Sequence, residues 1–280
     1  MTFLKKLHLH PILILFMIIS ILTGTFIHLF ILFSIVLIHE AGHYVMAKYF
    51  EWEIHSIMLW VFGGVMKTDE TISRPVKQEV LVTIAGPIQH VFIFLMLHGF
   101  SYTSLVTGDL IVSAHYYNVI LFGFNLLPIY PLDGGKLLLS CMSAIIPFKK
   151  AYEWTILFSV FGCVVILLYQ LIFFPFTLSA FMLFLFLLWE NHIEWKYRTY
   201  LFLRFILNRQ THERHSVLHV PGYYQLMDVF HLFRRNYHHT IYIENIDRSI
   251  DEKNCINMYV KERKIHDRLD DIWTKHGSMT

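Results

Sequence analysis

The residues best suited to chemistry in this chain are His39, Glu40 and His43, inside one long apolar segment, residues 26–50. In a helix, His39 and His43 are one turn apart, so both imidazoles project from the same face and can hold one Zn²⁺. Glu40 is turned about 100° from His39. Its carboxylate can therefore reach an attacking water beside the metal without binding the metal itself. The pattern predicts a zinc site with Glu40 as general base.

The apolar surroundings of Glu40 favour this interpretation. The segment is longer than the about 20 residues that cross a bilayer, and a carboxylate near its middle costs about 2.5–3.5 kcal/mol to insert. No Lys or Arg lies near Glu40 within the segment, so a divalent cation is the natural charge partner. The alternative is a neutral Glu40 bonded to a neighbouring helix, with both histidines as packing residues.

A third zinc ligand must come from another segment, because a catalytic zinc usually has three protein ligands and one open position. Residues 125–135 hold two prolines and two glycines, which break an otherwise apolar run. Backbone groups freed at membrane depth need a cavity lined by protein or water. There Asp133 offers a carboxylate to the metal, and the amide of Asn125 can hold a substrate or stabilise an oxyanion. Alternatively, Asp133 marks a span end and pairs with Lys136.

A further segment with an unusual pattern connects two apolar runs. Residues 57–66 read as a strand that is interrupted by Gly63 and Gly64. The strand can dip back into the protein beside the metal, and its glycines let a substrate backbone approach closely. An extended substrate would then pair with its edge. The alternative is a surface hairpin turn.

Composition predicts a membrane α-helical fold class. The chain has 280 residues, 55% of them hydrophobic, and a net charge of +2, which gives no reason to expect a nucleic-acid partner. Three scattered cysteines argue against disulfides and against a thiolate metal site. Lys and Arg alternate between the connections, which predicts cytoplasmic termini. The six predicted transmembrane helices cover about residues 8–23, 26–50, 79–99, 112–146, 154–173 and 176–193.

The C-terminal part is more charged, which predicts two domains: residues 1–194 in the membrane, and residues 195–280 as a linker and small cytoplasmic α/β domain. The sixth span can continue as a helix through Leu207. After it, patterns predict a strand over 216–220, a helix over 224–236, a strand over 240–244 and a helix over 255–273. This β-α-β-α order resembles a cystathionine-β-synthase-type (CBS-like) domain. Such a resemblance implies binding of ATP and a homo-oligomer formed through this domain.

Four motifs together resemble the site-2 protease family of intramembrane metalloproteases over about residues 1–194: His39-Glu40-Ala41-Gly42-His43, Phe62-Gly63-Gly64, Ala85-Gly86-Pro87 and Asn125 with Leu132-Asp133-Gly134. The resemblance implies zinc bound by His39, His43 and Asp133, with Glu40 as base.

The residues before the first span, His8-Leu9-His10-Pro11, and the C-terminal domain are similar to the branch of that family that acts in endospore formation. This similarity implies a membrane-associated substrate, the precursor of a late mother-cell sigma factor, which loses its pro-sequence. It also implies inhibitor or regulator proteins in the membrane, and a location in the mother-cell membrane around the forespore. Another membrane-anchored regulator is the alternative substrate within the family.

Two function classes compete with the protease. A zinc transporter or intramembrane sensor would use the same ligands but would not need Glu40 beside His39. A proteolytically inactive scaffold on the same fold would not need the complete His-Glu-x-x-His set. Activity of a Glu40→Gln protein separates the protease from both.

Overall fold

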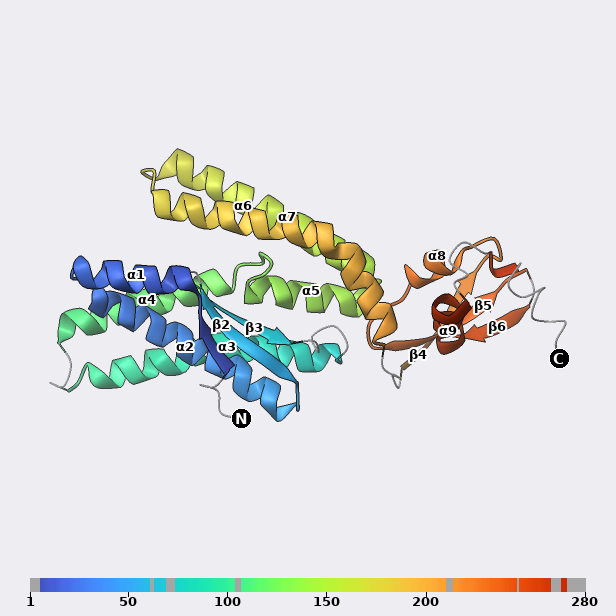
Figure 1. Ribbon diagram of the computed structural model, residues 1–280, viewed down its shortest axis with the longest axis horizontal. Helices are drawn as coiled ribbons and strands as arrows, with labels where there is room; N and C mark the ends of the chain where they lie inside the picture. Colours follow the sequence, from blue (N-terminus) through green and yellow to red (C-terminus); the bar gives the residue numbers. More distant parts are fainter. Residues whose placement is uncertain are drawn as a thin grey trace. The chain divides into compact units, whose positions relative to one another are not determined.

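The computed structural model describes residues 6–60, 63–68, 74–103, 107–209, 214–245, 247–262 and 268–270. The chain forms two compact units, each assembled from several parts of the sequence (Figure 1). The first contains residues 1–71, 77–138 and 158–191, and the second contains 72–76, 139–157 and 192–280. These units are defined by packing, so the division into domains 1–194 and 195–280 stays a prediction.

The first unit combines helices with a small sheet, which lies beside α2 and α3 in Figure 1. Its elements before the broken segment are β1 (Leu7–Leu9), α1 (Pro11–Leu22), α2 (Phe26–Tyr49), β2 (Ile54–Trp60), β3 (Gly63–Thr68), α3 (Val76–Phe100) and α4 (Gly108–Asn125). Three further helices, α5 (Asp133–Ile145), α6 (Phe148–Phe173) and α7 (Leu178–Leu207), contribute residues to both units.

Helix α2 matches the apolar segment that the sequence marks as a span. The chain leaves this helix in a tight turn, in which Glu51 has a φ of 57° and the amide of Trp52 bonds to the carbonyl of Ala47 at 2.9 Å. This turn leads directly into β2. The helix therefore carries the His-Glu-x-x-His residues and fixes where the sheet begins.

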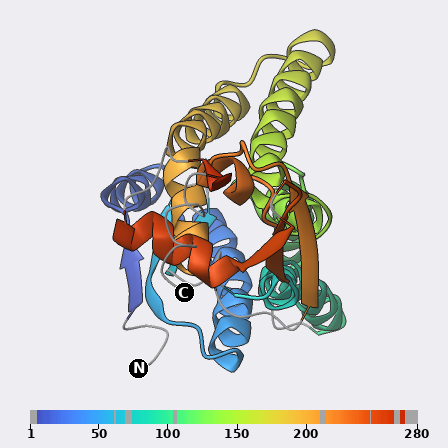
Figure 2. The ribbon, with the colours of Figure 1, turned by 90° about the vertical axis from the view of Figure 1, so that its right-hand side faces the viewer.

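The sheet has the order β1-β2-β3, with β1 parallel and β3 antiparallel to β2. Figure 2 shows β1, in blue, beside β2. The expected single strand over 57–66 is therefore a hairpin, in which Gly63 and Gly64 open the second strand instead of interrupting the first. Ile57 in β2 is buried against Ala47 of α2 and Val82 of α3, and this apolar contact holds the hairpin onto the helices.

Three of the described helices are long and apolar enough to cross a membrane: Phe26–Tyr49, Val76–Phe100 and Phe148–Phe173. The expected fourth span is divided into α4 and α5 by the segment 126–132, as its prolines predict. The first helix begins only at Pro11, because residues 7–9 pair with β2, and it has 12 residues. Helix α7 runs to Leu207 as one helix, which confirms the continuation of the sixth segment.

The second unit contains a sheet of β4 (Arg214–Val220), β5 (Tyr237–Ile243) and β6 (Arg248–Asp251), with α8 (Leu226–Phe230) and α9 (Glu252–Glu262). The two expected strands are present, and β6 adds an antiparallel strand that the sequence pattern did not predict. The helix expected over 224–236 has only 5 residues, because the chain turns after Phe230 and reaches a positive φ of 63° at Asn236. The helix expected over 255–273 begins at Glu252, and part of its range lies outside the described residues.

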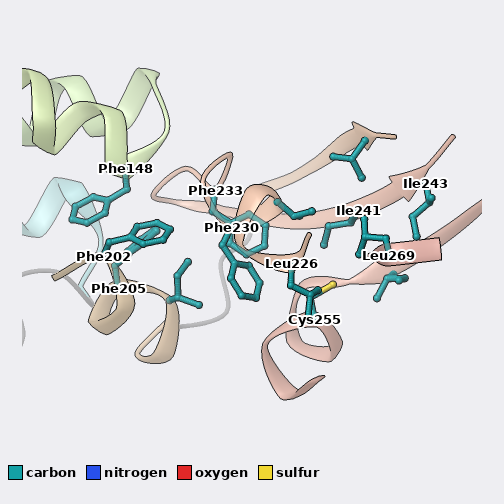
Figure 3. Close-up of a cluster of buried hydrophobic side chains, with 14 residues drawn as sticks. Phe148, Phe202, Phe205, Leu226, Phe230, Phe233, Ile241, Ile243, Cys255 and Leu269 are labelled. Atoms are coloured by element: carbon teal, nitrogen blue, oxygen red, sulfur yellow. The ribbon is translucent and has the colours of Figure 1, made fainter. Parts of the chain in front are cut away.

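One hydrophobic core holds the second unit together (Figure 3). The residues after α7 form a C-terminal tail. Phe230 and Phe233 of this tail belong to the same buried cluster as Phe148 of α6 and Phe202 and Phe205 of α7. The start of α6 and the end of α7 are therefore part of the same core as the residues after α7.

Polar contacts inside the second unit also join helix ends to the tail. Arg209, just after α7, forms a buried ion pair with Glu252, and its guanidinium lies 4.9 Å from the ring centre of Phe205. The Asn236 side chain accepts a bond of 3.1 Å from the amide of Val76, the first residue of α3. Burial raises the pKa of the Cys255 thiol to about 12, so this cysteine stays an uncharged core residue.

Candidate metal centre

Helix α2 brings His39, Glu40 and His43 together as the sequence pattern predicts. All three side chains are buried, with 4–6% of their surface exposed. One potential ligand atom from each lies within 4.8 Å of the others. The two imidazole rings meet at an angle of 83°, with centres 4.7 Å apart, so both Nε2 atoms point to one place.

Asp133 completes the cluster from the start of α5. Its Oδ2 lies 3.1 Å from Nε2 of His39 and 3.1 Å from Nε2 of His43, and the two Nε2 atoms are 3.0 Å apart. Ligands about 2.0–2.1 Å from one tetrahedral zinc are spaced about 3.3–3.4 Å apart. The three atoms therefore need only a small outward shift to hold one zinc ion.

The chemistry of these atoms also fits a cation. Nδ1 of His43 lies 2.8 Å from the carbonyl oxygen of Val82, which can only accept. In neutral His43 the proton is therefore on Nδ1, and Nε2 presents a lone pair to the carboxylate of Asp133. Two acceptors 3.1 Å apart repel unless a positive charge lies between them, which is what bound zinc supplies.

The broken segment before α5 is held by buried polar side chains. The amide of Tyr130 donates to Oγ of Ser159 on α6 at 2.8 Å, and Asn191 of α7 donates to the carbonyl of Tyr130. These contacts satisfy backbone groups that an unbroken helix would have paired internally. They fix the position from which Asp133 reaches the metal ligands of α2.

The two glycines after Asp133 have a packing role. A side chain at Gly134 would collide with the carbonyls of Leu126 and Leu127, and one at Gly135 would meet the carbonyl oxygen of Ile129 at 2.6 Å. Only glycine lets the first turn of α5 pack this closely against the segment. On the next turn, Lys136 donates to Oδ1 of Asp133 at 3.2 Å, so the expected Asp133–Lys136 pair forms together with the ligand cluster.

The other predicted site residues have different surroundings. A Cβ on Gly64 would meet Oε1 of Glu40 at 2.7 Å, which places β3 directly against the general base. Gly63 is the first residue of β3 and pairs with Trp60. Asn125 ends α4, and its amide donates to the carbonyl of Leu121 at 3.0 Å. This bond keeps the Asn125 amide on its own helix, and its substrate role stays a prediction.

Comparison with known proteins agrees with this site. The sequence matches Peptidase family M50 over residues 27–111 and 102–169. It is 32% identical to Stage IV sporulation protein FB of Bacillus subtilis over 275 residues, which cover 95% of this chain and 96% of that protein. The chain belongs to peptidase family M50.

A sequence match and a structural match to this M50 protein come from Methanocaldococcus jannaschii. A zinc metalloprotease is 34% identical over 116 residues, which cover 40% of this chain and 33% of that protein. The solved site-2 protease matches with a TM-score of 0.55 and 27% identity, over 67% of this chain and 89% of that one. The M50 protein therefore has a site-2 protease fold and is by family a zinc metalloendopeptidase, which favours the protease over the transporter and scaffold alternatives.

The role of α3 in the M50 site is the part that sequence reasoning missed. Gly42 of α2 packs so closely on α3 that a Cβ there would collide with the carbonyl of Ala85. A Cβ on Gly86 would meet Cε1 of His39 at 2.8 Å and collide with the ring of His43. In the sequence, Ala85-Gly86-Pro87 is only one motif of a family resemblance, whereas in the structure its glycine makes room for both imidazoles.

The two glycines beside the site give a paired prediction. Gly86→Ala should lower zinc content and activity together, because its methyl group displaces the rings of the two histidines. Gly64→Ala should lower activity and leave zinc bound, because the three atoms nearest to the added methyl group all belong to Glu40. Zinc per purified chain and peptide hydrolysis are the measurements. Gly99→Ala is the control, since a Cβ at Gly99 on the same helix α3 meets nothing within 4 Å. Parent-like zinc and activity in Gly86→Ala would contradict the packing described here.

Proposed function

We propose that this M50 protease removes the pro-sequence of a sporulation sigma-factor precursor at the cytoplasmic side of the membrane. The observation that carries the proposal is the extent of the similarity to Stage IV sporulation protein FB, 95% of this chain and 96% of that protein. This similarity includes the tail after α7, whereas the M. jannaschii zinc metalloprotease shares only 40% of the chain. The tail is therefore part of what relates this protein to a sporulation protein.

In the proposed reaction, Glu40 moves the proton. Zinc held by His39, His43 and Asp133 supplies polarisation of the scissile carbonyl and of the attacking water. Glu40 accepts a proton from that water and donates it to the leaving amine. Its position follows from α2, which places a carboxylate oxygen of Glu40 within 4.8 Å of a ring nitrogen of His39 and of His43. Burial of all four side chains excludes bulk water, which strengthens each charge interaction at the site.

The proposed substrate binds as an extended strand, since a peptide carbonyl inside a helix is shielded. Strand β3 is an edge strand of the described sheet, and its residue Gly64 lies against Glu40. Pairing with β3 would place a substrate carbonyl beside the general base. Asn125 is proposed to hold the substrate or the developing oxyanion.

The proposed topology has six spans with both termini in the cytoplasm, in the mother-cell membrane around the forespore. It rests on the three membrane-capable helices and on the Lys/Arg asymmetry of the connections. Reporter fusions after Arg74 and Lys150 should be cytoplasmic, and one after Asp109 should lie on the opposite side. A cytoplasmic reporter at Asp109 would remove the six-span arrangement.

The tail is proposed to be a CBS-like regulatory domain. Its observed β-α-β-β-α order contains the expected β-α-β-α order with β6 added. ATP binding, a homo-oligomer through this domain and contact with membrane inhibitor proteins are the proposed regulatory interactions. Ligand binding to a folded state raises its thermal midpoint. An unchanged midpoint of the solubilised full chain with millimolar ATP would count against nucleotide binding.

The substrate proposal is tested by co-production with a candidate sigma-factor precursor. We expect a shorter product whose appearance requires Glu40, detected as a size shift in membrane fractions. A second co-production with an unrelated membrane-anchored regulator separates the two substrate classes. Cleavage of that regulator alone, with the precursor intact, would overturn the proposed substrate and leave the protease itself in place.

A further inference from the structure

Behind the zinc ligand His39 lies a short chain of buried polar side chains. Nδ1 of His39 is 3.0 Å from Nε2 of His90 on α3. Nδ1 of His90 is 2.8 Å from Oδ1 of Asn118 on α4, and Nδ2 of Asn118 donates to the backbone carbonyl of His90 at 2.9 Å. Both His90 and Asn118 retain only 2% of their exposure. Neither of them is a zinc ligand or the general base.

The direction of every bond in this chain follows from the amide of Asn118. A backbone carbonyl only accepts, so the NH₂ group of Asn118 must face the carbonyl of His90, and its oxygen must face Nδ1 of the ring. That oxygen also only accepts, so Nδ1 of His90 carries the proton and Nε2 is bare. The bare Nε2 accepts from Nδ1–H of His39.

The hydrogen bond from His39 to His90 also determines the state of Nε2, the nitrogen of His39 that faces the metal site. Because the proton of His39 lies on Nδ1, its Nε2 presents a lone pair to the point shared with His43 and Asp133. We propose that His90 and Asn118 are positioning residues, in which Asn118 sets the tautomer of His90 and His90 thereby holds His39 ready to bind zinc. The inference rests on the zinc site described above and goes beyond its ligands.

The two histidine ligands are oriented by different means. Nδ1 of His43 meets the carbonyl of Val82, which accepts and cannot donate, so that bond has only one possible direction. His90 is an imidazole and can present either a lone pair or an N–H to His39. If it presented an N–H, the proton of His39 would have to lie on the metal-facing Nε2. Asn118 removes this ambiguity, which explains why a third helix contributes a buried amide here.

The experiment measures zinc affinity by competition with a chelator in detergent, on the full chain. His90→Leu and Asn118→Leu should each weaken zinc binding by about 10–100-fold, the usual effect of losing an outer-shell partner. His90→Glu should bind zinc nearly as the parent does, because a carboxylate only accepts from His39. His98→Leu, on the same helix α3 but exposed, is the matched control and should not change affinity.

A double variant separates the proposed role from a purely structural one. In the His90→Glu background, Asn118→Leu should cause no further loss of zinc affinity, because a carboxylate has no tautomer to be set. The thermal midpoint of each metal-free variant is recorded in parallel, and Asn118→Ala replaces Asn118→Leu if the latter does not fold. An equal loss of affinity from Asn118→Leu in both backgrounds, or parent-like affinity of His90→Leu, would overturn the proposal. Zinc binding by the parent protein tests the zinc site itself. A failure of the zinc site can therefore be distinguished from a failure of the positioning role of His90 and Asn118.

Discussion

Glu40→Gln is expected to abolish peptide hydrolysis while the protein keeps its zinc and its fold. Glutamine has almost the size of glutamate, so packing against Gly64 of β3 is preserved. It cannot accept a proton from the attacking water, and loss of a general base costs about 10²–10⁴-fold in rate. Removal of a buried charge also does not hinder membrane insertion, so poor expression is not the expected cause of lost activity.

The measurement combines cleavage of a co-produced substrate with zinc content of the purified variant. Glu190→Gln is a matched control, because the same change is made in a half-buried residue of α7 outside the described site. It should leave cleavage and zinc unchanged. Wild-type rates in Glu40→Gln would refute the proton-transfer role, and loss of zinc from that variant would show that Glu40 instead supports the metal site.

Local sequence patterns were sufficient for the half of the site that lies on one element. His39, Glu40 and His43 are within four residues of one another, so the geometry of a single helix fixes how they meet. The break that carries Asp133 was also predictable, since Pro128 and Pro131 cannot continue a helix. The roles of the histidines and Asp133 as ligands, and of Glu40 as base, follow from chemistry that these residue types share with other zinc sites.

The contribution of α3 and α4 could not be predicted, because it depends on which helices pack against α2. His90 and Asn118 look like any polar residues in apolar segments until packing places them behind His39. Gly86 gave a signal only as one residue of a motif. Nothing in the surrounding sequence shows that the two imidazoles occupy the space that a side chain at Gly86 would fill.

The tail shows a second limit of pattern reading. Phe202 and Phe205 lie in the helical continuation predicted beyond the sixth span, yet they are buried in the same core as Phe230 and Phe233. Helix α8 is short for a related reason: the amphipathic pattern over 224–236 is satisfied by a turn that directs Phe233 into that core. In both places long-range packing decided the outcome, and local periodicity could not report it.

Asp133→Asn is expected to release zinc, in contrast to Glu40→Gln. An amide is a much weaker zinc ligand than a carboxylate, and the change also removes the negative charge that faces both histidines at 3.1 Å. The ammonium of Lys136, 3.2 Å from Oδ1 of Asp133, would then repel the metal without a counter-charge. We expect a loss of zinc affinity larger than the about 10–100-fold that an outer-shell partner provides, with activity lost in parallel.

Asparagine is the appropriate replacement because it preserves the shape of the first turn of α5, where glycines pack tightly against the preceding segment. A thermal midpoint close to that of the metal-free parent would show that the fold survives. Lys136→Met is the control: it removes the ammonium but keeps the carboxylate, so zinc should remain bound. About one zinc per chain with full activity in Asp133→Asn would mean that the third ligand is another residue. Zinc lost in this variant and retained in Glu40→Gln would separate the ligand from the base, two carboxylates in one buried site with different tasks.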